Sequence, residues 1–309
     1  MIKIEDLSFE YTTFIKNPGI KGTLKDLFKR DIKKINALEK INLKIRDGEM
    51  VGLIGPNGAG KTTLTKLLTG ILHPTQGTIL VNSTIPSNQN NQFLKEIGVL
   101  FGQKSQLSWD LPAIDTLNML SKIYSIPTDR YQSRLQELTR MLDVEKILRI
   151  PVRKLSLGQR VRCELMCSLI HSPKYLFLDE PTLGLDIVTQ SSIYKFLKKE
   201  NREHHTTIII TSHYLKDIEE LTDRLLIIMK GSLVYDGSTN DLPINPEEFQ
   251  HFLIKYSDGE KQKEIVIDAK DVSKKIEELG IEKILSVTRQ GISLEDFVMN
   301  LFAKKEQNK

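Results

Sequence analysis

A glycine-rich loop between an apolar segment and a helical pattern constrains this chain more than any other feature. Residues 49–54 read EMVGLI, residues 55–63 read GPNGAGKTT, and LTKLLTGIL follows. The short apolar run predicts a strand, and the spacing of apolar residues after the loop predicts a helix. Glycines in such a loop let successive backbone N–H groups turn inward onto an anion at the start of the helix. The order of strand, loop and helix therefore predicts a phosphate-binding site.

The loop has the spacing of the Walker A motif, because Gly55 is followed after four residues by Gly60, Lys61 and Thr62. We expect Lys61 to reach the β- and γ-phosphates of a nucleoside triphosphate and Thr62 to ligate Mg²⁺. A glycine turn that contains a lysine by chance is the alternative, and the flanking strand and helix disfavour it. The predicted nucleotide-binding residues of the loop are Gly55, Pro56, Asn57, Gly58, Ala59, Gly60, Lys61, Thr62 and Thr63.

Two acidic residues end a second apolar segment, YLFLDEP, at residues 175–181. Its apolar part is typical of a central parallel strand that is buried on both faces. Ligands of open α/β sheets bind beyond the carboxyl ends of the strands. Asp179 is therefore expected to hold Mg²⁺ through water, and Glu180 to polarise the water that attacks the phosphate. Ordinary acids in a solvated loop are the alternative, which Pro181 and the turn at residues 184–186 disfavour.

A third apolar strand is predicted at residues 207–210, and Thr211, Ser212 and His213 follow it. The same argument brings the His213 imidazole to the edge of the sheet where the phosphates bind. We expect His213 to contact the γ-phosphate and the attacking water, with a structural histidine as the alternative. His204 and His205 lie in a polar segment and are expected to be solvated.

Residues 155–159, LSLGQ, precede another helical pattern. Ser156 with Gln159 three residues later predicts a capping box, which by itself is a structural role. Together with the Walker A loop, the LDEP strand about twenty residues further on and His213, however, this pentapeptide resembles the signature of the ATP-binding cassette family. The resemblance covers roughly residues 1–240.

The resemblance implies an α/β P-loop NTPase fold with a parallel core sheet, an antiparallel β subdomain and a helical subdomain at about residues 104–172. It also implies ATP and Mg²⁺ as cofactors. In this family two cassettes pair head to tail, and the signature of one closes over the ATP that the Walker A loop of the other holds. Such a cap is physically reasonable, since a helix N-terminus presents positive potential to phosphate.

Further site residues follow from the resemblance position by position. Gln103 is similar to the Q-loop glutamine, with a role in catalysis and at Mg²⁺, and Asp186 to the D-loop aspartate. Tyr11 resembles the aromatic residue that stacks on adenine, although it lies unusually far before Gly55. Leu157 replaces the usual middle glycine of the signature, and we expect activity to be retained. The predicted signature contacts are Ser156, Leu157, Gly158 and Gln159.

The segment of about residues 12–36 is an insertion relative to the family pattern. It carries seven Lys or Arg residues against two Asp residues, a local charge of +5. A helical spacing of apolar residues predicts a short amphipathic helix with a basic face. Docking on the chain's own antiparallel subdomain and contact with lipid headgroups or a membrane subunit both remain open. The apolar residues concerned are Leu24, Leu27, Phe28, Ile32 and Ile35.

Residues 243–309 differ in composition from the cassette and predict a small α+β accessory domain. Strands are expected near residues 252–254, 265–267 and 284–287, and a charged helix near residues 270–279. The segment contains no metal-binding cluster or glycine-rich loop, so a structural or dimer-stabilising role is expected. Trp109, in the loop after Gln103, is expected either to pack internally or to contact a transporter subunit. Cys163 and Cys167 are expected to be small buried residues.

No run of eighteen apolar residues and no signal peptide is present in the sequence. We therefore expect a cytoplasmic protein at the inner face of the membrane, bound to separate integral membrane permease subunits and paired with a second nucleotide-binding subunit, either another copy or a paralogue. The sequence is similar to ATPases of bacterial ABC-2-type exporters. The net charge of +4 is too mild for a dedicated nucleic-acid binder, and no nucleic-acid partner is expected.

Two other functions were weighed. A soluble cassette ATPase that acts on ribosomes or DNA is the main alternative. The single Walker A motif disfavours the two-cassette translation factors, and the lack of a sustained heptad pattern disfavours DNA-repair cassettes. A nucleotide-binding module without turnover is disfavoured because every hydrolytic position is filled.

Overall fold

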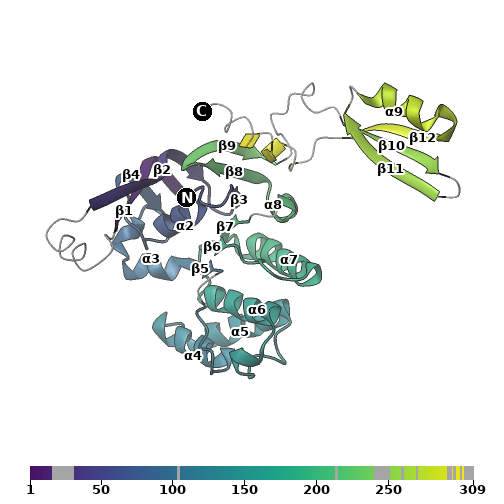
Figure 1. Cartoon of the computed structure of the whole chain (residues 1–309). Coiled ribbons are helices and arrows are strands. Elements are labelled where there is room, and N and C mark those ends of the chain that lie inside the picture. The colour runs from purple at the N-terminus through teal and green to yellow at the C-terminus, as the bar shows by residue number, and fades with distance from the viewer. Residues whose placement is uncertain are drawn as a thin grey trace, which may run out of the picture. The chain divides into compact units, whose positions relative to one another are not determined.

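The computed structural model describes residues 1–15, 31–102, 105–212, 215–239, 251–258, 261–268, 271–290, 294, 297–299 and 301–302. The chain divides into two compact units, Met1–Gly237 and Ser238–Lys309, whose elements are labelled in Figure 1. The boundary expected at residues 240–243 lies outside the described residues.

The first unit is built on a six-stranded sheet with the order β5-β6-β7-β3-β8-β9. The pairings among β5, β6, β7, β3 and β8 are parallel, so the carboxyl ends of these strands lie at one edge. All residues of β6 and β7 are buried, which explains their unbroken apolar sequences. The predicted strands at residues 49–54, 175–178 and 207–210 are confirmed as β3 (Met50–Ile54), β6 (Tyr175–Asp179) and β7 (Thr207–Thr211). The other strands of the sheet are β5 (Ile97–Phe101), β8 (Arg224–Met229) and β9 (Ser232–Ser238).

Helices α2 (Lys61–Leu68), α7 (Ile187–His204) and α8 (Leu215–Leu221) belong to the same unit. Helix α2 contacts β6, and α8 contacts both β3 and α7. Helix α2 begins directly after the glycine-rich loop, which fixes the loop at the carboxyl edge of the sheet. None of the helices that the structure describes combines the length and the apolar character that crossing a bilayer requires.

A second sheet forms the predicted antiparallel subdomain. It contains β1 (Ile2–Ile15), β2 (Asp31–Ile45) and β4 (Gln76–Val81) in the order β2-β1-β4. Its apolar residues, Ile4 and Ile41 among them, share one buried cluster with Leu53 of β3 and Leu64 of α2. The antiparallel sheet and the core sheet are therefore held to each other by a common hydrophobic core.

The amphipathic helix expected in residues 12–36 is wrong for the parts of this segment that the structure describes. Residues 12–15 continue β1, residues 31–36 begin β2, and Tyr11 pairs with Ile35 in an antiparallel ribbon. Ile32 and Ile35 therefore lie in a strand. The pairing with β1 satisfies the backbone of β2, and at these positions it overrides the apolar spacing that predicts a helix. Leu24, Leu27 and Phe28 lie outside the described residues.

Three helices form the predicted helical subdomain: α4 (Ala113–Ile123), α5 (Thr128–Leu142) and α6 (Leu157–Leu169). They lie together beside the core sheet in Figure 1. Helix α6 packs against α4, α5 and β5, and it buries Cys163 and Cys167 as expected. The Arg160 guanidinium lies 5.1 Å from the centre of the Trp109 ring. Trp109 is also 53% exposed, so internal packing covers only part of it. The shorter elements of the unit are η1 (Pro86–Asn88), α3 (Asn91–Glu96) and η2 (Val152–Lys154).

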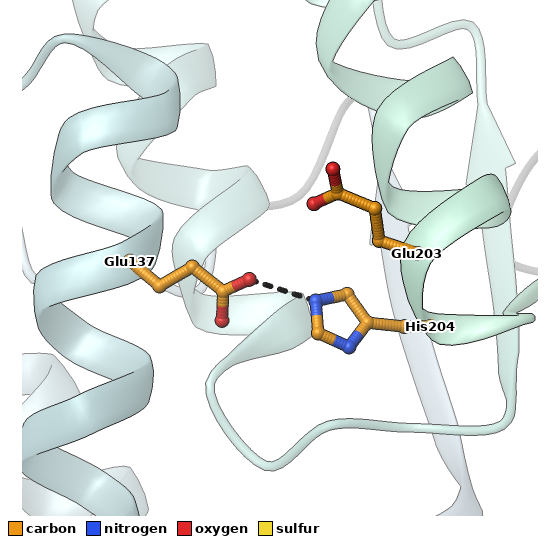
Figure 2. Close-up of side chains that lie close together, drawn as sticks. All are labelled: Glu137, Glu203 and His204. Atoms are coloured by element: carbon orange, nitrogen blue, oxygen red, sulfur yellow. Dashed lines mark hydrogen bonds and ion pairs between the residues drawn. The ribbon is translucent and has the colours of Figure 1, made fainter.

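An ion-pair network joins α5 to α7. Arg134 donates to Glu200 Oε1 at 2.5 Å and to Glu137 Oε2 at 2.8 Å. His204 is exposed, as expected for this polar segment, and its Nε2 also lies 2.8 Å from Glu137 Oε1. Figure 2 shows Glu137 on one helix facing His204 and Glu203 on the other. Among the described residues, these three offer a possible set of metal ligands. However, Arg134 Nη1 lies 2.9 Å from His204 Nε2, so a cation already holds this position.

The second unit contains a three-stranded antiparallel sheet with the order β11-β10-β12. Ile254 at the centre of β10 is fully buried, and its neighbours Phe252 to Ser257 are partly buried. The expected α+β architecture of this segment is confirmed. The elements are β10 (His251–Asp258), β11 (Lys261–Asp268), α9 (Val272–Leu279), η4 (Ile281–Lys283) and β12 (Ile284–Gln290).

Candidate nucleotide-binding site

The glycine-rich loop leaves β3 and enters α2 with a backbone that only glycine adopts without strain. Gly58 has φ +78° and Gly60 has φ +114°. A Cβ atom on Gly60 would lie 2.8 Å from the carbonyl oxygen of Ala37. Both the left-handed backbone and the close approach therefore require glycine. Pro56, Asn57 and Gly58 are exposed, so the face of the loop that would hold phosphates is open.

Lys61 is the first residue of α2 and folds back over the loop. Its Nζ donates to the carbonyl oxygen of Gly55 at 2.6 Å and to that of Pro56 at 3.3 Å. Burial lowers the pKa of the Lys61 ammonium below its ordinary value, while the charges of Glu180 and Asp179 act in the opposite direction. A buried cation that is held mainly by carbonyl groups is well placed to bind an anion, because an anion compensates its desolvation.

Asp179 connects three segments at the carboxyl edge of the sheet. Its Oδ2 accepts a hydrogen bond from Thr62 Oγ1 at 2.9 Å, and its Oδ1 accepts one from Thr211 Oγ1 at 2.7 Å. The predicted metal-binding residues Thr62 and Asp179 are thus in direct contact. Their hydroxyl and carboxylate oxygens are the hard ligands that Mg²⁺ prefers. The residues present therefore fit a magnesium ion, with Thr62 and Asp179 as the described residues that would hold it.

Glu180 has φ +53°, which is uncommon for a residue with a side chain. Its backbone N–H donates to Thr211, with the carbonyl oxygen at 3.2 Å and Oγ1 at 3.0 Å. Thr211 thus fixes both carboxylate residues, because its hydroxyl also binds Asp179. The sequence analysis did not predict this role. The signal that could have found it is a hydroxyl residue at the carboxyl end of an apolar strand that neighbours the acidic one.

Thr62, Asp179 and Glu180 line a cavity of about 440 Å³. The loop contributes Asn57, helix α2 contributes Thr62 and Lys66, and the acidic strand contributes Asp179 and Glu180. None of the described residues that line the cavity comes from residues 155–159. Leu157 lines a neighbouring cavity of about 240 Å³ together with Glu180, so the signature lies near the acidic loop of its own chain but does not line the expected phosphate cavity beside Thr62.

Two predicted catalytic residues, Gln103 and His213, lie outside the described residues, and their roles stay predictions. Their described neighbours do reach the site. Gly102 N–H donates to the Asp179 carbonyl oxygen at 3.0 Å, and Ser212 N–H donates to the Leu53 carbonyl oxygen at 3.4 Å. The chain thus passes the edge of the sheet at both points. Glu164 of α6 also accepts a hydrogen bond from the backbone of Gln106 at 3.1 Å, a contact that sequence reasoning missed.

Tyr11 reaches the beginning of α2 despite its distance from the loop in sequence. Its hydroxyl lies 3.2 Å from Thr63 Oγ1, and its ring packs edge-to-face on Phe9 with centroids 4.8 Å apart. The side chain remains 36% exposed. The antiparallel ribbon accounts for the sequence separation, since Tyr11 lies on β1 just before the inserted part. Its position beside Thr63 is compatible with adenine stacking, which stays a prediction.

Ser156 is the N-cap of α6, and the predicted capping box is present. Ser156 Oγ accepts from Gln159 N–H at 3.3 Å, and Gln159 Oε1 accepts from Ser156 N–H at 3.0 Å. Ser156 and Leu157 are both exposed. The signature thus presents a helix N-terminus, with its positive potential, on the surface.

Asp186 is the N-cap of α7. Its Oδ1 accepts from Thr189 N–H at 2.9 Å, and its Oδ2 accepts from Thr189 Oγ1 at 2.7 Å. These hydrogen bonds lower the pKa of the Asp186 carboxyl below its ordinary value. The carboxylate is exposed and charged, at a loop two residues beyond Gly184.

The comparisons with known proteins agree with this geometry. The family model described as ABC transporter matches residues 38–183. The ABC transporter ATP-binding protein NatA of Bacillus subtilis is 32% identical over 223 residues, which cover 71% of this chain and 90% of that protein. The daunorubicin resistance ATP-binding protein DrrA3 of Streptomyces coeruleorubidus is 32% identical over 206 residues, 67% of this chain and 65% of that protein.

The methionine import ATP-binding protein MetN 2 of Enterococcus faecalis is 29% identical over 218 residues, 69% of this chain and 63% of that protein. A solved structure of the ATP binding subunit of an ABC transporter superposes with a TM-score of 0.65 at 24% identity, over 78% of this chain and 90% of that one, which supports the fold. Motifs, fold and relatives lead to one conclusion: the chain belongs to the ABC transporter family and is an ATP-binding, ATP-hydrolysing subunit of that family.

Proposed function

We propose that two copies, or one copy and a paralogue, close head to tail over ATP and thereby drive export through separate integral membrane subunits at the inner face of the cell membrane. One observation carries the proposal. The phosphate cavity lacks residues 155–159 among its described lining, whereas Ser156 and Leu157 are exposed at a helix N-terminus. Each chain thus has an open anion site at its Walker A loop and an exposed anion-binding helix N-terminus at Ser156. In a head-to-tail pair, the helix N-terminus of one chain can cover the anion site of the other.

Each predicted site residue has a role in this scheme. Lys61 and the backbone N–H groups of the loop bind the β- and γ-phosphates. Thr62 and Asp179, together with Gln103, hold Mg²⁺, which neutralises phosphate charge when bound. Glu180 orients the attacking water from a backbone that Thr211 fixes, and His213 assists it. Tyr11 stacks on adenine.

The residues of the second chain complete the site. Ser156 and Gly158 direct a hydroxyl and a backbone N–H group at the γ-phosphate, with Leu157 and Gln159 beside them, and Asp186 approaches the same nucleotide. Closure requires all of these groups at once. ATP binding is therefore the step that draws the two chains together, and hydrolysis releases them.

The surface for the membrane subunit lies beside the helical subdomain. A cavity of about 670 Å³ is lined by Leu94 of α3, by Phe101 of β5 and by Ile123 and Tyr124 at the end of α4. Ile123 is largely exposed, as is Trp109 in the preceding loop. We assign this apolar groove to a cytosolic segment of the permease. We favour export because DrrA3, which is named for drug resistance, is 32% identical to this chain. MetN 2, which is named for import, is 29% identical and represents the opposite direction.

The test is purification of the tagged chain from its own cells in mild detergent, with identification of the chains that accompany it. The Glu180→Gln variant is purified in parallel with ATP, because loss of the water-orienting carboxylate should stop turnover and preserve the ATP-bound dimer. An integral membrane protein in the complex is the expected result. Ribosomal or chromosomal partners in its place would favour the soluble alternative. Hydrolysis at the wild-type rate by Glu180→Gln would remove Glu180 from the catalytic assignment.

A further inference from the structure

We propose that Thr189 is a positioning residue that sets the spacing between the signature and Asp186 within one chain. The inference rests on the proposed function, in which Gly158 and Asp186 both reach the nucleotide of the second chain. Sequence reasoning gave Thr189 no role. In this arrangement the signature and the Asp186 loop of one chain are held together as one surface before the second chain binds.

Both branches of the Thr189 side chain are engaged, and both lie near Gly158, where a built Cβ atom would be 2.9 Å from Cγ2 and 3.3 Å from Oγ1. The hydroxyl donates to Asp186 Oδ2 at 2.7 Å, and the backbone N–H donates to Asp186 Oδ1 at 2.9 Å. The methyl group faces Gly158, because a Cβ atom built on Gly158 would lie 2.9 Å from Thr189 Cγ2. A β-branched side chain has few rotamers, and the hydrogen bond to Asp186 selects one. The methyl group therefore cannot turn away from Gly158 while the hydroxyl holds Asp186.

A second contact joins the same two segments on the other side of Asp186. A Cβ atom on Gly184 would lie 3.3 Å from Leu157 Cδ2, and Gly184 has φ +75°. Leu157, which stands where the family usually has glycine, is 40% exposed and rests its side chain against this glycine. Residues 157 and 158 thus contact the chain at positions 184 and 189, on both sides of Asp186.

The contacts connect two parts of the cassette. Leu157 and Gly158 begin α6 of the helical subdomain, whereas Thr189 lies in the first turn of α7, which packs on α8 of the core unit. The spacing between signature and Asp186 is therefore fixed by side-chain packing across this boundary. The chain's own Walker A residues take no part in these contacts. Changing the spacing should consequently alter kcat and ATP-driven dimerisation, and leave ATP binding by the separate chain unchanged.

A double-mutant cycle tests the proposal, with Gly158→Ala, Thr189→Ser and the combined variant. Gly158→Ala places a methyl group against Thr189 Cγ2 and should lower kcat roughly 5- to 150-fold, the range that overpacking strain gives when it acts on the reaction. Thr189→Ser keeps the hydroxyl for Asp186 and removes the opposing methyl group. Alone it should lower kcat by less than Gly158→Ala does, because it loses the methyl contact and keeps the hydrogen bond to Asp186, and in the combined variant it should restore most of the activity that Gly158→Ala loses. Equilibrium binding of a fluorescent ATP analogue should be the same for all four proteins.

Thr189→Val is the complementary variant. It tests the positioning role even if Gly158→Ala does not fold. It keeps the methyl contact with Gly158 and removes the hydrogen bond to Asp186, so kcat should fall while ATP binding is retained. Wild-type kcat for Thr189→Val, or a combined Gly158→Ala and Thr189→Ser variant no more active than Gly158→Ala alone, would overturn the positioning role.

Ser156→Arg separates this inference from the function on which it rests. A bulky cation at the cap should abolish ATPase activity and ATP-driven dimerisation if the signature acts across two chains. Full activity of Ser156→Arg would overturn the head-to-tail site and the positioning role together. Loss of activity in Ser156→Arg, combined with additive effects in the Gly158 and Thr189 cycle, would overturn the positioning role alone.

Discussion

Replacement of Arg134 by Met should destabilise the first unit strongly, because it leaves a buried carboxylate without its cation. Arg134 and Glu200 are 6% and 1% exposed, and Glu200 Oε2 has no hydrogen-bond partner. Glu200 would then keep only His204 as a possible ion-pair partner, with 4.0 Å between His204 Nε2 and Glu200 Oε2. Removal of one member of a buried ion pair costs about 3–5 kcal/mol. For a unit of this size, that corresponds to a decrease in Tm of about 6–20 °C.

The assay is thermal unfolding followed by circular dichroism at neutral pH, with two reference variants. Arg153→Met removes an ion pair with Asp110 whose side chains are 56% and 73% exposed, so it should cost only about 0–1 kcal/mol. Combining Arg134→Met with Glu200→Met removes the stranded charge and should recover most of the lost stability. An Arg134→Met variant that unfolds at the same temperature as Arg153→Met would refute the argument, as would a double variant less stable than Arg134→Met.

Two further predictions follow from the described contacts. Thr211→Val removes the hydroxyl that holds Asp179 and Glu180, and it should lower kcat about 5- to 100-fold. Thr207→Val on the same strand is the control and should leave kcat unchanged. Equal kcat values for the two variants in a steady-state ATPase assay would contradict the prediction. Burial lowers the pKa of His171 from 6.5 to about 4. Between these two pH values the unfolded chain binds a proton at His171 and the folded chain does not. The free energy of unfolding should therefore fall as pH decreases from about 6.5 towards 4. His171→Phe keeps a ring to stack on Tyr124 and should show a smaller decrease in Tm between pH 7 and pH 5; an identical decrease would rule out His171 as the source.

The parts of the fold that were predictable share one property: their signal lies within a short stretch of sequence. The strands that end at Ile54, Asp179 and Thr211 are apolar because both faces of a central parallel sheet are covered. The capping box needs only Ser156 and Gln159, three residues apart. The Walker A loop carries its glycines at fixed spacing because the backbone geometry there admits little else.

The missed features depend on partners that are distant in sequence. Arg134 meets Glu200 and His204 only because α5 packs on α7, so neither segment by itself predicts the ion-pair network. Thr211 acts on Asp179 through the pairing of β7 with β6. The apolar spacing around Ile35 predicts a helix because no local pattern shows that β1 and β2 continue as a paired ribbon. In each case tertiary packing, which no local pattern encodes, decided the outcome.

The candidate site shows the same division. Lys61, Thr62 and Asp179 were found from sequence because motif spacing and strand polarity place them at one edge. The contact of Thr189 with Gly158 was not, because it joins two helix N-termini that lie in different subdomains. Residues that bind the nucleotide are thus more readily predicted than the residues that position them.

The most direct test of the central claim is complementation between two inactive variants. Lys61→Ala lacks the phosphate-binding lysine, and Ser156→Arg lacks the signature cap. If each site combines Lys61 of one chain with Ser156 of the other, a mixed dimer contains one intact site and one doubly defective site. Mixing the two purified variants should therefore restore ATP-driven association and part of the ATPase activity, although each variant alone is inactive. A mixture that stays inactive over a range of ratios, with both variants correctly folded, would contradict the shared site.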